Sequence, residues 1–382
     1  MRVLVATTAG AGHLGPLVPF ARAVRAKGHQ VVVTAPASFA SAVERSGFPH
    51  RPFADGSAEE QGNVFAGLAG VTNEEGNAIV LRDVFGRINA RAALPGVTEL
   101  VEHWRPDLVV RETAEFASYI AADAAGIPHV QVAIGLSEFE ELYLPVLEEP
   151  LAELGSVSGV GGLLASPRLS LLPKSYDGSG GASLTTTTRY REEGRGAVQS
   201  LPDWWPVPDL PLVYVTFGSV AAGLGLFPVL YQQVVGALAD LPVRVLLTTG
   251  EAADPELLGP LPSNVHVERW WPQEHVMPHA AAIVGHGGFG TTLLGLASGV
   301  PMVVIPLFAD QPYNAARVAA IGAGVALDGG PAAVNRLAQA LEQVLSEESY
   351  RRCARSIADE IGRLPPVADS VPFLEAVAAP PG

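Results

Sequence analysis

The sequence is short of cysteine and of basic residues, and each shortage excludes a class of protein. Cys353 is the only cysteine in 382 residues, so no disulfide within the chain is possible. No Cys/His cluster has the spacing of a zinc site. The 24 Lys and Arg are outnumbered by 39 Asp and Glu, which argues against non-specific binding to nucleic acid. A phosphorylated small ligand is still allowed, because backbone N–H groups and helix dipoles neutralise phosphate locally.

Long apolar runs are also missing. No run reaches the roughly 18 residues that a transmembrane helix needs. The first residues, with Arg2 before an apolar run, predict a buried strand rather than a signal peptide. We therefore expect a cytoplasmic protein without a membrane span. A hydrophobic content of 48% provides ample core, and the length predicts two domains.

Strand and helix patterns alternate along the chain. Arg2–Thr7 is a continuous apolar strand, and after a glycine-rich turn residues 17–26 carry apolar side chains at helical spacing. Gly28 stands where a helix C-cap belongs, before a second apolar strand. The same alternation starts again near residue 211. It predicts parallel sheets with helices on both faces.

We interpret the chain as an α/β protein of two Rossmann-like, doubly wound parallel-sheet domains that face each other across a cleft. A ligand belongs at the carboxyl ends of the strands. Two stretches of weak periodicity, 55–95 and 136–200, are interpreted as irregular binding regions. The predicted parts are an N-terminal domain at 1–200, a proline-rich linker at 201–211, a C-terminal domain at 212–360, and a segment at 361–382 that returns to the first domain.

Two segments match the pattern Gly-x-Gly-x-x-Gly, and they begin at Gly10 and Gly285. A dehydrogenase would also place an acid at the end of the second strand, where this chain has Thr34 and Ala35; this counts against NAD. The second match, Gly285–Thr292, brings bare backbone N–H groups to a helix N-terminus, which favours an anion. Close packing explains the same turn when it is taken alone.

Residues on both sides of this turn suit a nucleotide sugar. Trp270 and Trp271 follow a strand, and an indole stacks on a base for roughly 1–3 kcal/mol. Asp310 and Gln311 follow another strand and combine an acceptor with an amide, which suits vicinal hydroxyls. Taken alone, the tryptophans also suit packing, and an Asp-Gln pair is more often a helix cap.

Together these residues resemble a known family. The segment ERWWPQEHVMPHAAAIVGHGGFGTTLLGLASGVPMVVIPLFADQPYNAARVAAIGAG is similar to the donor-binding signature of GT-B glycosyltransferases. The resemblance is to the actinobacterial antibiotic and natural-product members of the UDP-glycosyltransferase-like superfamily. The opening GHLGPLVPFARAVRAKGHQVVV is similar to the N-terminus of the same enzymes.

The resemblance implies a donor site in the second domain. Plant members carry a glutamate for the ribose hydroxyls at the position of Leu294, and its loss here predicts a deoxyribonucleotide donor such as a dTDP-sugar. The implied donor residues are Trp270 at the base, with Gln273 nearby, Ser219, His286, Gly287, Gly288, Gly290 and Thr291 around the diphosphate, and Asp310 and Gln311 at the sugar.

The resemblance also implies inverting sugar transfer to a hydroxyl, with His13 in the position of the catalytic base. Glu112, at the end of PDLVVRE, is the expected carboxylate partner of His13, and Glu115 is the fallback. The leaving diphosphate is stabilised by the glycine turn, so neither a metal nor a cofactor beyond the nucleotide sugar is expected.

The acceptor is expected to be an apolar natural-product aglycone. The aromatic residues of the variable segments suggest such an acceptor, but packing in the core explains their presence equally well. The sequence allows a homodimer without requiring one. Two alternatives stay open, a GT-B nucleotide-sugar epimerase and a non-catalytic auxiliary protein, with an NAD oxidoreductase behind them. The candidate acceptor contacts are Phe53, Phe85, Phe116 and Phe139.

Overall fold

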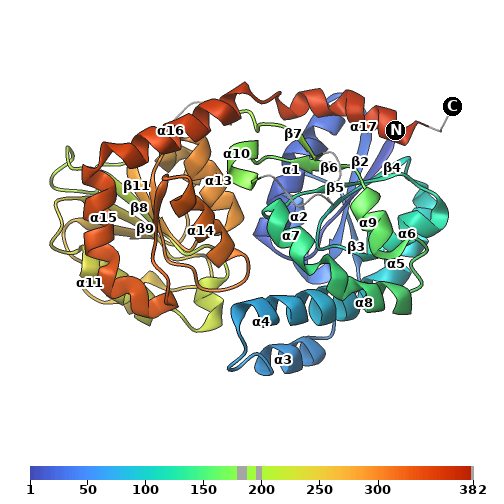
Figure 1. The fold of residues 1–382 in the computed structure, drawn as a ribbon, viewed down its shortest axis with the longest axis horizontal. Coiled ribbons are helices and arrows are strands. Elements are labelled where there is room, and N and C mark those ends of the chain that lie inside the picture. Colours follow the sequence, from blue (N-terminus) through green and yellow to red (C-terminus); the bar gives the residue numbers. More distant parts are fainter. Residues whose placement is uncertain (179–186, 195–199, 380–382) are drawn as a thin grey trace. The chain divides into compact units, whose positions relative to one another are not determined.

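The computed structural model describes residues 1–178, 187–194 and 200–379. These residues divide into two compact units (Figure 1). The first comprises Met1–Glu193 and Leu364–Gly382, and the second comprises Gly194–Arg363. Each unit is built on one parallel sheet, which confirms the predicted class of two Rossmann-like α/β domains.

The first sheet has seven strands in the order β3-β2-β1-β4-β5-β6-β7, all paired in parallel. The central strands β1 and β4 are buried along nearly their whole length, as expected of apolar runs covered on both faces. The strands are β1 (Arg2–Ala6), β2 (Gln30–Pro36), β3 (His50–Phe53), β4 (Leu108–Glu112), β5 (His129–Val132), β6 (Arg168–Ser170) and β7 (Thr187–Arg189).

The helices of the first unit include one that starts earlier than predicted. The first helix begins at Ala11 rather than at Leu17, so the glycine segment after β1 forms its first turns. The α-helices are α1 (Ala11–Ala26), α2 (Ala40–Ser46), α3 (Ala58–Ala66), α4 (Asn73–Ile79), α5 (Ala90–Trp104), α6 (Ala117–Ala125), α7 (Ser137–Tyr143), α8 (Glu148–Glu153), α9 (Gly159–Ala165), α10 (Lys174–Asp177) and α17 (Val371–Ala378). A π-helix, η2 (Val80–Asn89), and the 3₁₀ turns η1 (Ala37–Phe39), η3 (Leu144–Leu147) and η8 (Val367–Ser370) complete the unit.

The interpretation of stretch 55–95 as irregular is wrong, because the segment is helical almost throughout. Its helices start at clear sequence signals. Ser57 caps α3 by accepting from the backbone of Glu60, and Thr72 forms a capping box with Glu75 at α4. Stretch 136–200 also forms α7 to α10 with β6 and β7, but GSGGAS and part of TTTT lie largely outside the described residues.

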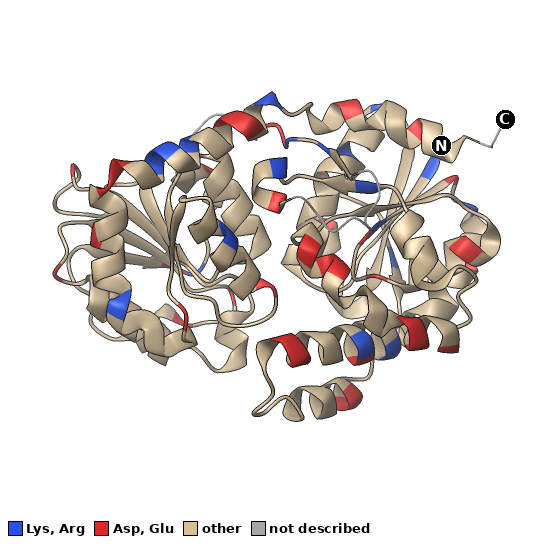
Figure 2. Cartoon of the chain, in the orientation of Figure 1, with Lys and Arg blue, Asp and Glu red and all other residues tan. Residues whose placement is uncertain are grey.

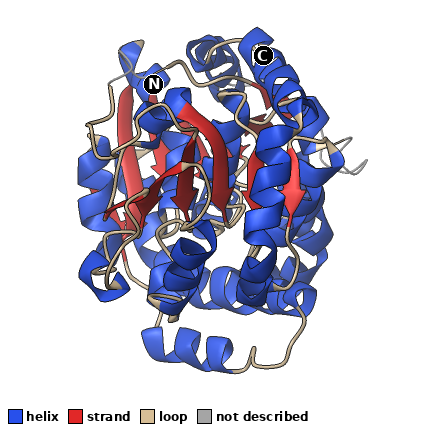
Figure 3. Cartoon of the chain, turned by 90° about the vertical axis from the view of Figure 1, so that its left-hand side faces the viewer, coloured by secondary structure: helices blue, strands red, loops and turns tan. Residues whose placement is uncertain are grey.

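The second sheet has six parallel strands in the order β10-β9-β8-β11-β12-β13. Helices cover both of its faces, and Figure 3 shows them on either side of the strands. The strands are β8 (Leu212–Thr216), β9 (Arg244–Thr248), β10 (Val265–Glu268), β11 (Ala280–Gly285), β12 (Met302–Val304) and β13 (Gly324–Ala326). The α-helices are α11 (Val229–Leu238), α12 (Gln273–Val276), α13 (Phe289–Ala297), α14 (Gln311–Ala320), α15 (Leu337–Ser346) and α16 (Glu348–Arg363), with 3₁₀ turns η4 (Ala221–Leu224), η5 (Pro255–Leu258), η6 (Met277–His279) and η7 (Gly330–Arg336).

Residues 201–211, interpreted from the sequence as a linker, contain a tryptophan doublet that packs on the second unit. The Trp205 indole is buried, and its Nε1 donates to the Val245 carbonyl at 3.2 Å. The Trp204 ring stacks on His266 with centroids 4.1 Å apart. The doublet is therefore anchored to β9 and β10. None of the described helices is both long and apolar enough to cross a membrane.

Candidate functional site

In both sheets the first three strands follow one another toward one edge, and the fourth strand then pairs on the other side of the first strand. The strand order 3-2-1-4-5-6 places this change of direction between β1 and β4 in the first unit and between β8 and β11 in the second. In open α/β sheets, ligands bind beyond the carboxyl ends of the strands at this switch point. Four predicted site residues lie at the carboxyl ends of these four strands: Glu112 is the last residue of β4, and His13, Ser219 and His286 follow β1, β8 and β11.

At the switch point of the first sheet, His13 is paired with Glu112. His13 lies in the first turn of α1, and Glu112 is the last residue of β4. His13 Nδ1 lies 3.1 Å from Glu112 Oε1. The Glu112 side chain is fully buried, whereas the His13 side chain is 22% exposed. The pair therefore combines a fixed carboxylate with an imidazole that solvent or a ligand can reach.

The Glu112 carboxylate is held by further donors. Oε1 accepts from the Thr8 backbone N–H at 3.1 Å and from the Thr8 hydroxyl at 2.9 Å, and Oε2 accepts from the Ala114 N–H. Burial raises the pKa of Glu112, but the charge of His13, its hydrogen bond and the two backbone donors outweigh burial and lower that pKa below its ordinary value. The side chain is thus held as a carboxylate. Thr8 is a residue that sequence reasoning missed.

The fallback partner, Glu115, has a different setting. Its carboxylate accepts from the Ser118 backbone at 3.1 Å and from the Ser118 hydroxyl, at the start of α6. Burial and the nearby Glu112 charge raise the pKa of Glu115 to about 7, against the lowering effects of Ser118 and Arg111. Of the two candidate carboxylates, the structure brings Glu112 to the histidine.

Two features beside His13 limit the space around its ring. Gly10 has φ +145°, and a Cβ there would lie 2.9 Å from His13 Cδ2. Gly12 and Gly15, the other glycines of the first motif, have open space where a Cβ would stand. On another side, the Phe85 ring lies 5.5 Å from the His13 ring, tilted by 33°. Of the three glycines in the first motif, only Gly10 is therefore required to avoid a collision with the His13 ring.

Phe85 is carried by the π-helix η2, which is tied to α8. A Cβ on Gly86 would lie 3.0 Å from Leu147 Cδ2, so the helix packs closely there. Arg87 forms ion pairs with Glu149 at 2.7 Å and Glu153 at 2.9 Å, and Figure 2 shows acidic and basic residues close together in this part of the first unit. π-helical turns are rare and are frequent at functional sites.

The other candidate acceptor residues differ in exposure. Phe53 and Phe116 are 6% and 1% exposed and belong to apolar core clusters. For these two residues the structure therefore shows core packing, which was the alternative to contact with an acceptor. Phe139, in α7, is half-buried, with its ring 5.0 Å from that of Tyr143.

At the switch point of the second sheet, the His286 ring is enclosed by glycines from two loops. A Cβ on Gly218 would lie 2.8 Å from His286 Nε2, and a Cβ on Gly288 would collide with the same ring. Burial lowers the pKa of His286 to about 4, while the Thr216 backbone acts in the opposite direction. The ring is therefore neutral at pH 7. Its Nδ1 is buried and has no hydrogen-bond partner within the described residues.

The glycine turn is linked to α14 by a residue that sequence reasoning did not single out. Asn314 Nδ2 donates to the Gly287 carbonyl at 2.8 Å and to Asp310 Oδ2 at 2.7 Å. Gly287 has φ +84°, and a Cβ there would lie 2.8 Å from Val304 Cγ1. The turn and the Asp310 carboxylate are therefore parts of one hydrogen-bonded unit. The signal in the sequence is the i, i+4 spacing of Asp310 and Asn314 on one helix face.

Gln311 and Ala309 fix the loop that precedes α14. Gln311 is 3% exposed, and its Oε1 accepts from the backbones of Leu307 at 2.9 Å and Phe308 at 3.1 Å. Ala309 has φ +55°, an unfavourable conformation for a residue with a Cβ. Asp310, at the N-cap position, makes no side-chain capping bond. The carboxylate is thus not used as a helix cap.

The residues upstream of the turn leave one indole accessible. The Trp270 side chain is among the exposed large hydrophobic residues, at 61%. Trp271 instead packs edge-on against Trp204, with centroids 4.8 Å apart. The Thr291 hydroxyl donates to Gln273 Oε1 at 3.2 Å, which ties α13 to α12, the helix that follows the Trp270 loop.

Ser219, in the loop between β8 and η4, and Gly290, the second residue of α13, are both exposed. A Cβ on Gly290 would have nothing within 4 Å, so packing does not require a glycine at this position. No group of three or more His, Cys, Asp or Glu side chains suited to a metal occurs within residues 1–178, 187–194 and 200–379.

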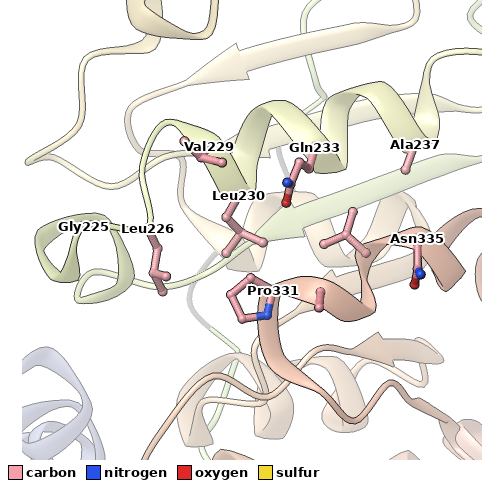
Figure 4. Close-up of a pocket in the computed structure, with 10 residues that line it drawn as sticks. Gly225, Leu226, Val229, Leu230, Gln233, Ala237, Pro331 and Asn335 are labelled. Atoms are coloured by element: carbon pink, nitrogen blue, oxygen red, sulfur yellow. The ribbon is translucent and has the colours of Figure 1, made fainter. Parts of the chain in front are cut away.

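A groove of about 650 Å³ lies elsewhere on the second unit, between α11 and η7 (Figure 4). Leu226, Val229 and Leu230 line one side, and Pro331 and Asn335 line the other. It contains none of the predicted site residues. The residues predicted to bind the nucleotide sugar therefore lie outside this groove.

Comparisons with known proteins cover nearly the whole chain. The family described as erythromycin biosynthesis protein CIII-like matches twice, its N-terminal domain over residues 22–207 and its C-terminal domain over residues 232–377. L-demethylnoviosyl transferase of Streptomyces niveus is 33% identical over 96% of this chain and 95% of its own length.

Two solved structures are similar over both units. The glycosyltransferase VinC in complex with dTDP has a TM-score of 0.77 at 27% identity, and the match covers 99% of this chain and 99% of that chain. The Streptomyces sp. SF2575 glycosyltransferase SsfS6, complexed with thymidine diphosphate, has a TM-score of 0.77 at 28% identity, and the match covers 98% of this chain and 99% of that chain.

Proposed function

The chain belongs to the erythromycin biosynthesis protein CIII-like family of GT-B glycosyltransferases, and we propose that it moves a sugar from a dTDP-sugar to a hydroxyl of an apolar natural-product acceptor. The observation that carries the proposal is the hydrogen bond between His13 Nδ1 and the buried Glu112 at the switch point of the first sheet. The names of the similar proteins describe transferases, which favours transfer over epimerisation or an auxiliary role.

In the proposed reaction His13 is the general base. Its Nδ1 faces Glu112, so Nε2 is the nitrogen that takes the proton of the acceptor hydroxyl. The acceptor oxygen forms a bond to the anomeric carbon, and the bond from that carbon to the diphosphate oxygen breaks. The electron pair leaves with dTDP, and attack opposite the leaving group inverts the anomeric centre. The Glu112 carboxylate stabilises the imidazolium that forms.

The donor is assigned to the second unit. The exposed Trp270 indole suits stacking on the base, and the glycine turn at the N-terminus of α13 suits the diphosphate. Charge on the leaving group would be stabilised there by backbone donors and the helix dipole, so we propose a reaction without a metal or resident cofactor. The proposed donor contacts are Trp270, Gln273, Ser219, His286, Gly287, Gly288, Gly290, Thr291, Asp310 and Gln311.

Two observations support thymidine in the donor. VinC and SsfS6 hold dTDP and thymidine diphosphate, and this chain is 27% and 28% identical to them. Leu294, on α13, offers no polar group to a ribose 2′-hydroxyl. Titration calorimetry with dTDP and UDP tests the assignment. We expect dTDP to bind more tightly, and equal or tighter binding of UDP would contradict it.

An apolar acceptor is supported by Phe85. Its ring lies 5.5 Å from that of His13, so an acceptor whose hydroxyl reaches the base also meets an aromatic surface. Phe139 is the second proposed contact, since it is half-buried. Phe85→Ala should raise KM for the acceptor and leave dTDP affinity unchanged.

The base assignment is tested by His13→Ala. We expect turnover to fall about 10²–10⁴-fold, the usual contribution of a general base, with dTDP affinity nearly intact because the nucleotide is held by the other unit. Equal loss of dTDP binding would sink the assignment. Asp310→Ala provides the matched contrast: weaker use of the sugar nucleotide, with little change in affinity for dTDP itself.

A further inference from the structure

The Thr8 hydroxyl contacts both members of the His13–Glu112 pair. Thr8 follows β1 and is 5% exposed. Its Oγ1 lies 3.0 Å from His13 Nδ1 and 2.9 Å from Glu112 Oε1, while His13 Nδ1 lies 3.1 Å from the same Oε1. The three polar atoms thus form a closed triangle with sides of hydrogen-bond length.

The protons of this triangle can be placed from the chemistry of the three groups. The Glu112 carboxylate only accepts hydrogen bonds, so the single Thr8 hydroxyl proton points to Oε1. The hydroxyl oxygen then presents lone pairs to His13 Nδ1. An unprotonated Nδ1 would face two acceptors, whereas a protonated Nδ1 donates to both. The triangle therefore favours the Nδ1–H tautomer, in which Nε2 carries the lone pair.

We propose that Thr8 is a positioning residue that, together with Glu112, holds His13 in the Nδ1–H tautomer and so keeps Nε2 as the proton acceptor. The kinetic consequence rests on the proposed base role of His13, but the tautomer assignment does not. Thr8 also holds the carboxylate itself through its backbone N–H, at 3.1 Å from Oε1.

Thr8→Val isolates the hydroxyl. Valine keeps the shape of the side chain, and the backbone N–H groups of residues 8 and 114 continue to hold the Glu112 carboxylate. Thr8→Ser restores the hydroxyl. Thr7→Val is the matched control, because Thr7 is also buried but its hydroxyl donates to the Thr8 carbonyl at 2.9 Å instead of to Glu112.

In steady-state kinetics, we expect Thr8→Val to lower kcat about tenfold, the effect of one lost hydrogen bond, with little change in KM for the dTDP-sugar. Thr8→Ser and Thr7→Val should stay close to the wild type. If Thr8→Val does not fold, Thr8→Ala replaces it, since a smaller side chain introduces no collision. Equal kcat values for Thr8→Val and Thr7→Val would overturn the proposal.

A second measurement does not depend on turnover. The ¹⁵N chemical shifts of His13, assigned by their loss in His13→Ala, report which ring nitrogen carries the proton. The wild type, Thr8→Ser and Thr7→Val should show a protonated Nδ1, and Thr8→Val should show a mixture of tautomers. Unchanged shifts in Thr8→Val would overturn the proposal. Full activity of His13→Ala would instead remove the base role and leave the tautomer result standing.

Discussion

Glu112→Gln replaces the most strongly held carboxylate of the first unit by an amide of the same shape. Wild-type Glu112 receives four hydrogen bonds, from His13, from the Ala114 N–H and from both donors of Thr8. A glutamine offers one oxygen, which can occupy either carboxylate position. If the oxygen takes the Oε1 position, the amide nitrogen faces the Ala114 N–H. If the nitrogen takes that position, it faces the Thr8 N–H.

One buried backbone donor therefore loses its acceptor in either orientation. Such a loss costs about 1–3 kcal/mol. In a domain of this size, each kcal/mol lowers Tm by about 2–4 °C, so a total decrease of about 2–12 °C is expected. The folded-state pKa of Glu112 is lowered, so its stabilising contribution is present above the ordinary carboxyl pKa and is lost as the pH falls through the folded value. The difference between the two proteins should accordingly shrink below about pH 4.

The effect on turnover is expected to be larger. The amide cannot neutralise the imidazolium of His13, and its N–H group, where it faces Nδ1, favours the wrong tautomer. We expect kcat to fall about 10²–10⁴-fold, as for loss of the proposed base itself. Thermal unfolding and steady-state kinetics with saturating dTDP-sugar measure the two effects. Glu102→Gln, at an exposed position of α5, is the control. A kcat within about twofold of the wild type, with the loss of stability present, would refute the reasoning.

The remaining predictions concern the second unit. Trp270→Ala should raise the Kd for dTDP about 5- to 150-fold by loss of stacking without changing Tm, whereas Trp205→Ala, at a buried indole, should cost about 3–5 kcal/mol of unfolding free energy. Gly288→Ala drives a methyl into the His286 ring and should cost about 1–3 kcal/mol, while Gly290→Ala should leave Tm unchanged or slightly raised. The pKa of His286 is about 4 in the folded protein and near 6.5 in the unfolded chain. As the pH falls from 6.5 to 4, the wild type should therefore lose about 3 kcal/mol of unfolding free energy relative to His286→Gln. Parallel stability curves for the two proteins would contradict this. Urea unfolding at several pH values and calorimetric titration with dTDP provide the measurements.

Local patterns in the sequence were sufficient to predict the class of fold. The apolar runs at Arg2–Ala6 and Leu212–Thr216, each followed by a helix, predict parallel α/β units because burial on both faces requires continuous apolar strands. The glycine turn with His286, and the pair Asp310–Gln311, could be proposed as donor contacts because their chemistry depends on residue types at short spacing. The helices of stretch 55–95 were missed because weak apolar periodicity concealed the caps at Ser57 and Thr72.

Contacts between distant segments were decided only by the tertiary structure. His13 and Glu112 are 99 residues apart and meet because β1 pairs in parallel with β4, so that the ends of both strands lie at one switch point. The same pairing brings the Thr8 hydroxyl between them, and no local pattern marks that threonine. The folded chain likewise separates Phe85, beside the histidine, from Phe53 in the core. The sequence by itself determined which reactive side chains the protein has. The pairing of the strands decided which of them lie together, because register and winding bring side chains into contact that are far apart in the sequence.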